Sequence, residues 1–213
     1  MANPKRVGLG TSGAATMPPP RLPEVVSDER RNAQRFITVY RPAAVAGEAG
    51  AGLARILNIS DGGMMLATSL PVGLGDRLRV ALSESTALEG EVVWHQPQRC
   101  GIRLDQEICA ADLLRSLRDE QSSATSRPLR LPLNSRARIV SEAGTHSVRI
   151  KDISQAGLKV SNPGSFFAGL KIKVCLPSGL ERRGIVRWAD GEHAGVMLHD
   201  PLRIDELGNL ARL

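Results

Sequence analysis

The chain has 213 residues, a length that fits one large domain or two domains of about 100 residues each. Hydrophobic residues make up 42% and charged residues 23% of the sequence, a globular composition that excludes a fully disordered or fibrous chain. The net charge of +6 rests on 23 Arg against 5 Lys. Because guanidinium binds phosphates bidentately, this surplus favours a nucleotide or nucleic-acid partner, although a GC-rich coding bias would produce it as well. Aromatic residues at 3% disfavour an RNA-binding sheet built on stacking rings.

Two kinds of pattern follow one another along the chain. Residues 1–27 are rich in Gly, Ala, Pro and Thr and show neither helical nor strand periodicity, so we predict a flexible tail there. From Arg35 onward apolar residues follow a period of two, as in Leu78, Val80 and Leu82, which alternate with charged or small residues. This alternation predicts half-buried antiparallel strands, separated by turns that contain Gly and Pro.

Two segments carry apolar residues at helical spacing. The first is residues 105–118, and residues 121–126 after it have the composition of a linker. The second is residues 201–213, where apolar side chains recur at every third position. We expect a helix in each segment that covers a core; docking against the other domain or a second chain is the alternative.

An internal repeat with an offset of 94 residues runs through the sequence. Residues 58–63 read Asn-Ile-Ser-Asp-Gly-Gly, and residues 152–157 read Asp-Ile-Ser-Gln-Ala-Gly. The same offset relates pairs further downstream, namely Val80 and Val174, Gly90 and Gly184, Trp94 and Trp188, Gly101 and Gly195. We therefore predict two copies of one domain, with a tail at 1–27, a first domain with a C-terminal helix at 28–120, a linker at 121–126 and a second domain at 127–213.

The repeated motif provides two hydrogen-bonding side chains in each copy. Strand alternation puts Asn58 and Ser60 on one face, and it does the same for Asp152 and Ser154. An amide or carboxylate can pair with a base edge, a hydroxyl can donate to a phosphate, and the glycine that follows permits close approach of the backbone. A turn that only caps a hairpin would use the same residue types, and this alternative remains open.

Arginines precede the first motif in the string Arg30-Arg31-Asn32-Ala33-Gln34-Arg35, in which the second and last arginines form R-x-x-x-R. Together with the motif at 58–63, Glu91-Val-Val-Trp94 and Gly101-Ile-Arg-Leu104, this string resembles the PilZ domain family. The resemblance covers residues 29–105 and 127–199. It implies an all-β fold with flanking helices, in which two tandem six-stranded antiparallel PilZ-type β-barrels follow one another.

The resemblance also implies a receptor for cyclic di-GMP (c-di-GMP), a bacterial second messenger with two guanines and two phosphodiesters. The arginines would contact phosphate and the guanine edge or stack on the base, the polar strand residues would hold guanine or phosphate, and the glycine would shape the turn. Ordering of segment 28–35 on binding would couple the messenger to an unidentified downstream protein, and a homodimer is compatible with this function. The implied ligand-binding residues are Arg30, Arg31, Arg35, Asn58, Ser60 and Gly63.

The second copy departs from the family pattern. Ser126 stands where the pattern has its first arginine, and Arg130 aligns with the second. A carboxylate at Asp152 would repel a phosphate unless it faces the N1–H and N2–H groups of a guanine. The second site, if it binds ligand, consists of Arg127, Arg130, Asp152, Ser154 and Gly157; if it does not, the second barrel is structural or docks a partner.

Motifs for catalysis and metal binding are missing from the sequence. Its four His and three Cys form no zinc-type cluster, and it contains no nucleophile elbow and no Walker loop. We therefore predict no enzymatic activity, no metal and no cofactor besides the ligand c-di-GMP. Two other functions stay open: a ligand-independent adaptor for protein–protein interaction, and a barrel that binds nucleic acid nonspecifically, which the low aromatic content disfavours.

The cellular compartment follows from the cysteines and from the hydropathy of the chain. Cys100, Cys109 and Cys175 are too few and too scattered to indicate a disulfide framework. Neither a convincing signal peptide nor an apolar run of 18 residues is present. We expect a cytoplasmic protein without membrane insertion.

Overall fold

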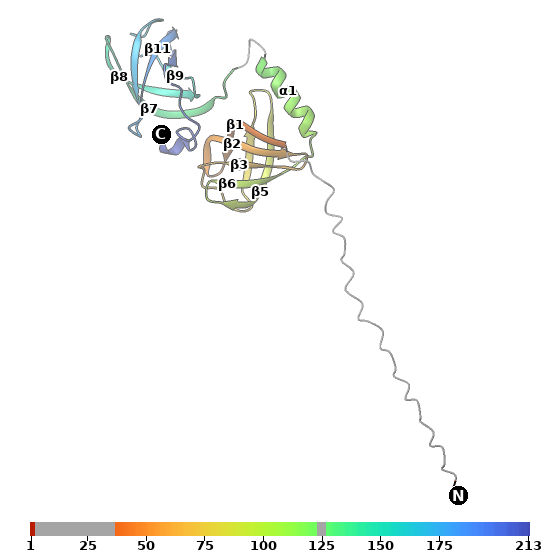
Figure 1. Ribbon diagram of the computed structural model, residues 1–213. Helices are drawn as coiled ribbons and strands as arrows, with labels where there is room; N and C mark the ends of the chain where they lie inside the picture. Colours follow the sequence, from red (N-terminus) through yellow and green to blue (C-terminus); the bar gives the residue numbers. More distant parts are fainter. Residues whose placement is uncertain (3–36, 123–126) are drawn as a thin grey trace. The chain divides into compact units, whose positions relative to one another are not determined.

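The protein is described by a computed structural model that covers residues 1–2, 37–122 and 127–213 (Figure 1). The predicted arginines Arg30, Arg31 and Arg35 and residues 123–126 of the predicted linker lie outside the described residues. The described chain forms two closed six-stranded antiparallel barrels, with one α-helix between them in the sequence. The predicted fold class is therefore confirmed.

The first barrel is closed by pairing between its first and fourth strands. Neighbouring strands follow the order β1-β2-β3-β6-β5-β4. Strand alternation produces this barrel, because Leu78 and Val80 are buried inside it while Arg77 and Arg79 between and beside them are exposed. The strands are β1 (Ile37–Gly47), β2 (Gly50–Ser60), β3 (Gly63–Ala67), β4 (Arg77–Ala81), β5 (Ala87–Gln96) and β6 (Arg99–Leu104).

The second barrel repeats the first in order and in register. Asn58 pairs with Met65 across β2 and β3, and Asp152 pairs with Lys159 at the equivalent place. A register shift precedes the motif residue in both copies, which shows that the 94-residue offset extends to irregular features. The strands are β7 (Leu131–Ser141), β8 (Gly144–Ile153), β9 (Gly157–Ser161), β10 (Lys171–Cys175), β11 (Glu181–Ala189) and β12 (His193–Leu198).

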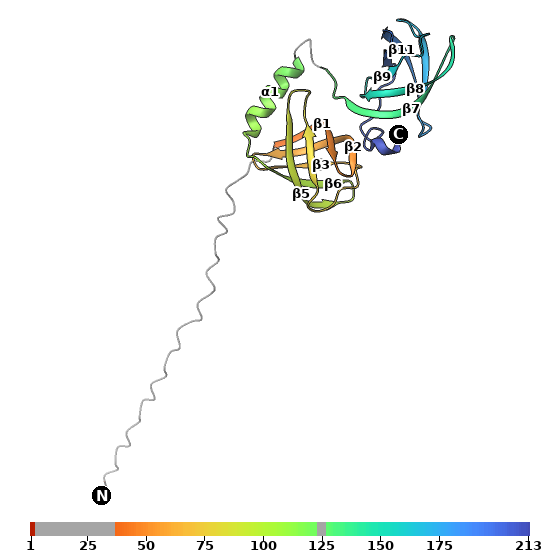
Figure 2. The same ribbon diagram turned by 180° about the vertical axis from the view of Figure 1, so that it is seen from behind.

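Helix α1 (Ala110–Ser122) lies against the first barrel in both views (Figure 1 and Figure 2). Leu117 is completely buried in the core of that barrel, with Ala110 beside the same cluster and Leu113 and Leu114 packed on it. The rest of the helix surface is polar, so the apolar stripe predicted from the sequence covers the core. The helix begins later than its predicted start and extends to Ser122.

The predicted second helix over residues 201–213 is wrong. That segment forms turns and a single 3-10 helix, η1 (Leu210–Arg212), whose first free amide is capped by Asn209. Apolar residues at every third position match the period of a 3-10 turn, and Gly208 interrupts any longer helix. Leu202, Leu207, Leu210 and Leu213 nevertheless pack into the core of the second barrel, so the expected core cover is present in another form.

Candidate ligand-binding site

The first motif forms the turn between β2 and β3. Ser60 is only 2% exposed, and its hydroxyl donates to the carbonyl oxygen of Gly63 over 3.2 Å. Gly63 has to be glycine, because a Cβ there would lie 2.6 Å from the carbonyl oxygen of Ile102 on β6. The serine and the glycine thus stabilise the turn, which leaves Asn58 as the motif side chain on the outer face of the sheet.

The same turn holds the N-terminus of α1. The backbone N–H of Ala110 donates to the carboxylate of Asp61 over 2.9 Å, and the N–H of Ile108 donates to the carbonyl of Asp61 over 2.9 Å. In the second barrel, Gln155 occupies the position of Asp61 and exchanges two hydrogen bonds with the backbone of Leu202. In each copy the motif turn therefore anchors the segment that follows the barrel. The contact joins residues 49 positions apart in the first copy and 47 positions apart in the second.

Asn58 belongs to a row of residues that crosses the outer face. Thr38 on β1 and Met65 on β3 are its partners in register, and Met65 is paired in turn with Gly101 on β6. The indole of Trp94 lies over Gly101, where a Cβ would overlap the ring. The row therefore runs from a hydroxyl through an amide to an aromatic ring that is 38% exposed.

A second row lies beside the first and carries positive charge. Arg55 on β2 is paired with Ala67 on β3, and Ala67 is paired with Arg99 on β6. One hollow of about 950 Å³ is lined by Thr38, Asn58 and Met65 of the first row and by the whole second row, together with Tyr40, which is 76% exposed. Arg55, Arg99 and Tyr40 were not predicted from the sequence, because their neighbourhood depends on the pairing of β3 with β6, which skips two strands in the chain.

The corresponding face of the second barrel is occupied by its own side chains. Arg130 forms an ion pair with Asp152 over 2.9 Å, and Lys159 is paired with Asp152 across the strands. Arg149, which corresponds to Arg55, donates to the amide oxygen of Asn134 over 2.8 Å. The structure thus brings Arg130 and Asp152 of the possible second site together as partners of each other.

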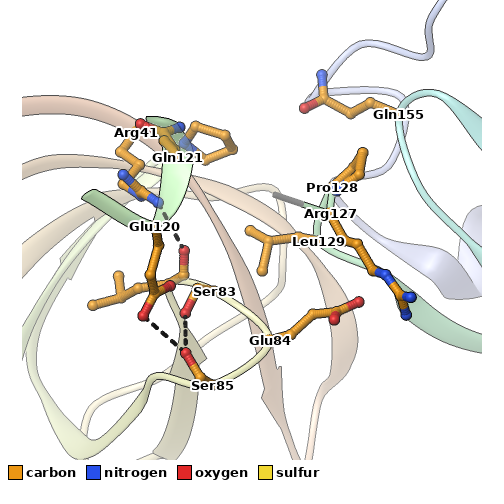
Figure 3. A pocket seen from close by; sticks show the side chains of 12 residues that line it. Arg41, Ser83, Glu84, Ser85, Glu120, Gln121, Arg127, Pro128, Leu129 and Gln155 are labelled. Atoms are coloured by element: carbon orange, nitrogen blue, oxygen red, sulfur yellow. Dashed lines mark hydrogen bonds between the residues drawn. The ribbon is translucent and has the colours of Figure 1, made fainter. Parts of the chain in front are cut away.

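Arg127 lines a different hollow, of about 420 Å³, which Figure 3 shows. Several polar groups that line this hollow have partners: Ser85 donates to the carboxylate of Glu120 over 3.0 Å, and the guanidinium of Arg41 donates to the carbonyls of Leu82 and Leu117. Two glutamates line this hollow with its two arginines, so it has no excess positive charge. It is a poor site for a phosphate.

The remaining strand arginines of the first barrel form ion pairs on the β4-β5-β6 face. Arg79 pairs with Glu89 over 3.3 Å and Arg103 with Glu91 over 2.9 Å. Arg77 donates to both carboxylate oxygens of Asp105, and this hydrogen bonding lowers the pKa of Asp105 below its ordinary value. Among the strand arginines of the first barrel, only Arg55 and Arg99 have no ion pair or hydrogen bond to a described residue, and both lie on the face that carries Asn58.

Among the described residues, no group of three or more His, Cys, Asp and Glu side chains could hold a metal ion. No helix in the described part of the chain is long and apolar enough to cross a membrane.

Fold and site together define a tandem β-barrel protein with one open polar face, next to the motif of its first barrel. The PilZ domain family matches the chain over residues 29–119 and 124–213. The chain therefore belongs to the PilZ domain family. Comparison with curated protein sequences found no match.

Several solved structures resemble the chain distantly. The Borreliella burgdorferi PlzA protein in complex with c-di-GMP has a TM-score of 0.36 and 12% identity, over 81% of this chain and 88% of that one. YcgR from Escherichia coli in complex with c-di-GMP has a TM-score of 0.30 and 10% identity, over 75% and 76%. The MrkH–c-di-GMP complex of K. pneumonia has a TM-score of 0.29 and 13% identity, over 77% and 80%.

Proposed function

We propose that this protein is a c-di-GMP receptor whose first barrel binds the dinucleotide on the outer face at Asn58. The observation that carries the proposal is the contrast between the two barrels of one PilZ chain. The first motif faces a hollow in which Asn58 has no described hydrogen-bond partner, whereas Asp152 in the second is neutralised by Arg130. Binding, without chemistry on the ligand, is the activity that such a face supports.

The chemistry of the ligand fits the side chains of the first barrel. The amide of Asn58 can accept from the N1–H group of a guanine while it donates to O6. Arg31 and Arg35, assisted by Arg30, supply the bidentate guanidinium groups that bind phosphate or stack on the base. A contact in the second barrel supports this assignment. There Arg130, the counterpart of Arg35, donates to the carboxylate of Asp152, the counterpart of Asn58.

The signal would pass through the segment that carries these arginines. Binding of the dianionic ligand would order residues 28–35, and the ordered segment would change how the protein contacts a downstream partner in the cytoplasm. Hydrogen exchange with saturating c-di-GMP measures this step. We expect added protection at the amides of residues 28–36 and 58–63; a protein that binds ligand without such protection would transmit its signal by another route.

Calorimetry of the full chain with c-di-GMP tests the binding itself. We expect the double variant Arg31→Ala, Arg35→Ala to lose at least about a hundredfold in affinity, since each arginine makes charge-assisted hydrogen bonds. Arg79→Ala is the matched control, because this arginine is paired with Glu89 across β4 and β5, away from the motif, and the variant should bind as the wild type does. Absence of binding by the wild type would favour the ligand-independent adaptor.

A further inference from the structure

Arg55 and Arg99 are the two strand arginines of the first barrel that have no hydrogen bond or ion pair to a described residue. The other arginines on β1 to β6 all have such partners: Arg41, Arg77, Arg79 and Arg103. An arginine gains from a carboxylate or carbonyl when one is within reach, so two neighbours without either leave ten donors for a ligand.

The register places the two arginines on either side of one small residue. Ala67 lies between Arg55 and Arg99, and strands are spaced by about 4.8 Å, so their Cα atoms are about 10 Å apart on the same outward face. Buried neighbours confirm the orientation, because Ile56 and Cys100 next to them point into the core. The small methyl group of Ala67 leaves space above it, where both long side chains can converge on one anion.

The surroundings of the pair are polar and carry little negative charge. Thr38 and Gln96 line the same hollow, and its carboxylate, Asp205, is already paired with Arg203 over 2.9 Å. The turn that leads into Arg99 is held by a hydrogen bond from the N–H of Thr68 to the carbonyl of Gln98 over 3.0 Å. The start of β6 is thereby fixed relative to β3.

The second barrel lacks this arrangement at the equivalent positions. Arg149 replaces Arg55 but donates to Asn134, His193 replaces Arg99, and Ser161 replaces Ala67. The hydroxyl of Ser161 accepts from the backbone N–H of Arg149 over 2.9 Å. The first barrel, where Asn58 has no described hydrogen-bond partner, therefore carries two such arginines. The second barrel, where Asp152 is paired with Arg130, does not have them at the equivalent positions.

We propose that Arg55 and Arg99 form an anion subsite that takes a phosphodiester group beside the Asn58 position. Two arginine forks that converge on one group suit a phosphate, whose oxygens accept several charge-assisted hydrogen bonds at once. The phosphodiester has two sources: the second phosphate of the c-di-GMP held at Asn58, or a phosphate of a second c-di-GMP molecule. The assignment of the phosphodiester to c-di-GMP rests on the proposed function, whereas anion binding by Arg55 and Arg99 does not.

Inorganic pyrophosphate tests the subsite independently of c-di-GMP. In the full chain, titration with pyrophosphate followed by NMR of the arginine Nε–H groups should shift the signals of Arg55 and Arg99 saturably. The signal of Arg79, paired with Glu89, serves as the internal control and should shift little. Equal shifts of all three signals, or none, would overturn the subsite whatever the protein does with c-di-GMP.

Calorimetry with c-di-GMP then identifies the source of the phosphate. For Arg55→Ala, Arg99→Ala we expect at least a tenfold loss of affinity and a weaker dependence of affinity on salt, while Arg79→Ala matches the wild type. An unchanged stoichiometry assigns the second phosphate of one ligand, and a fall from two ligands to one assigns a second molecule. Wild-type affinity, stoichiometry and salt dependence in the double variant would refute the proposal, while failure of the wild type to bind c-di-GMP would refute only the proposed function.

Discussion

Gly101 is the residue through which β6 accommodates the ring of Trp94. A methyl group there would overlap the indole, so Gly101→Ala forces the ring off the sheet and exposes part of the apolar surface it covers. We expect a loss of about 1–3 kcal/mol in the free energy of unfolding, measured by urea denaturation. Gly73→Ala is the control, because the nearest atom to its Cβ would be 3.8 Å away. Equal stability of the two variants would show that packing does not fix the ring.

The roles of the motif residues were only partly predictable from the sequence. Alternation could place Asn58 and Ser60 on one face of a strand, because its pattern depends only on neighbours along that strand. It could not show that the hydroxyl of Ser60 is bonded to the carbonyl of Gly63, since the turn conformation determines that contact. The open alternative of a turn-stabilising serine describes what the structure contains, and ligand contact by Ser60 stays a prediction.

At the scale of elements, the motif turn and helix α1 are joined by Asp61. Its carboxylate accepts from the first backbone N–H of the helix, the role of an N-cap side chain, although Asp61 lies 49 residues before Ala110. We expect Asp61→Ala to cost about 1 kcal/mol and to speed hydrogen exchange in the first turns of α1. Asp61→Asn should retain most of the stability, because its amide oxygen still accepts.

Asp119→Ala provides the matched control for this prediction. Asp119 is an exposed acid on the same helix, beyond its middle, where a negative charge contributes nothing favourable to the helix dipole. Its removal should leave stability and exchange unchanged or slightly improved. If Asp61→Ala behaved in the same way, the long-range cap would contribute nothing to the helix.

The contrast between the two terminal segments explains why one helix was predicted correctly and the other was not. Residues 110–122 contain neither Gly nor Pro, so helical periodicity and backbone preference agree. Residues 201–213 begin with Pro and contain Gly208, and their apolar side chains at every third position also suit successive 3-10 turns. Periodicity alone did not separate these cases, whereas the repeat predicted two copies of one domain because it depends on many positions at once.

At the scale of the whole molecule, the net charge of +6 is distributed unevenly. Seven arginines of the described residues form ion pairs with carboxylates, three of them on the β4-β5-β6 face of the first barrel. We therefore expect only weak binding to duplex DNA at about 0.15 M salt, with a Kd no tighter than about 10⁻⁶ M. Fluorescence anisotropy with a labelled duplex measures this affinity. Nanomolar binding at that salt concentration would instead favour the nucleic-acid-binding barrel.

The repeat also provides an optical label for each barrel. The chain has two tryptophans, and Trp94 and Trp188 occupy equivalent places, each across a glycine on the outer face and each partly exposed. With Trp188 replaced by Phe, the emission spectrum reports the first barrel alone, and with Trp94 replaced it reports the second. Unfolding of the two halves, and quenching by a guanine that stacks near either ring, can therefore be followed separately in one intact chain without any added dye.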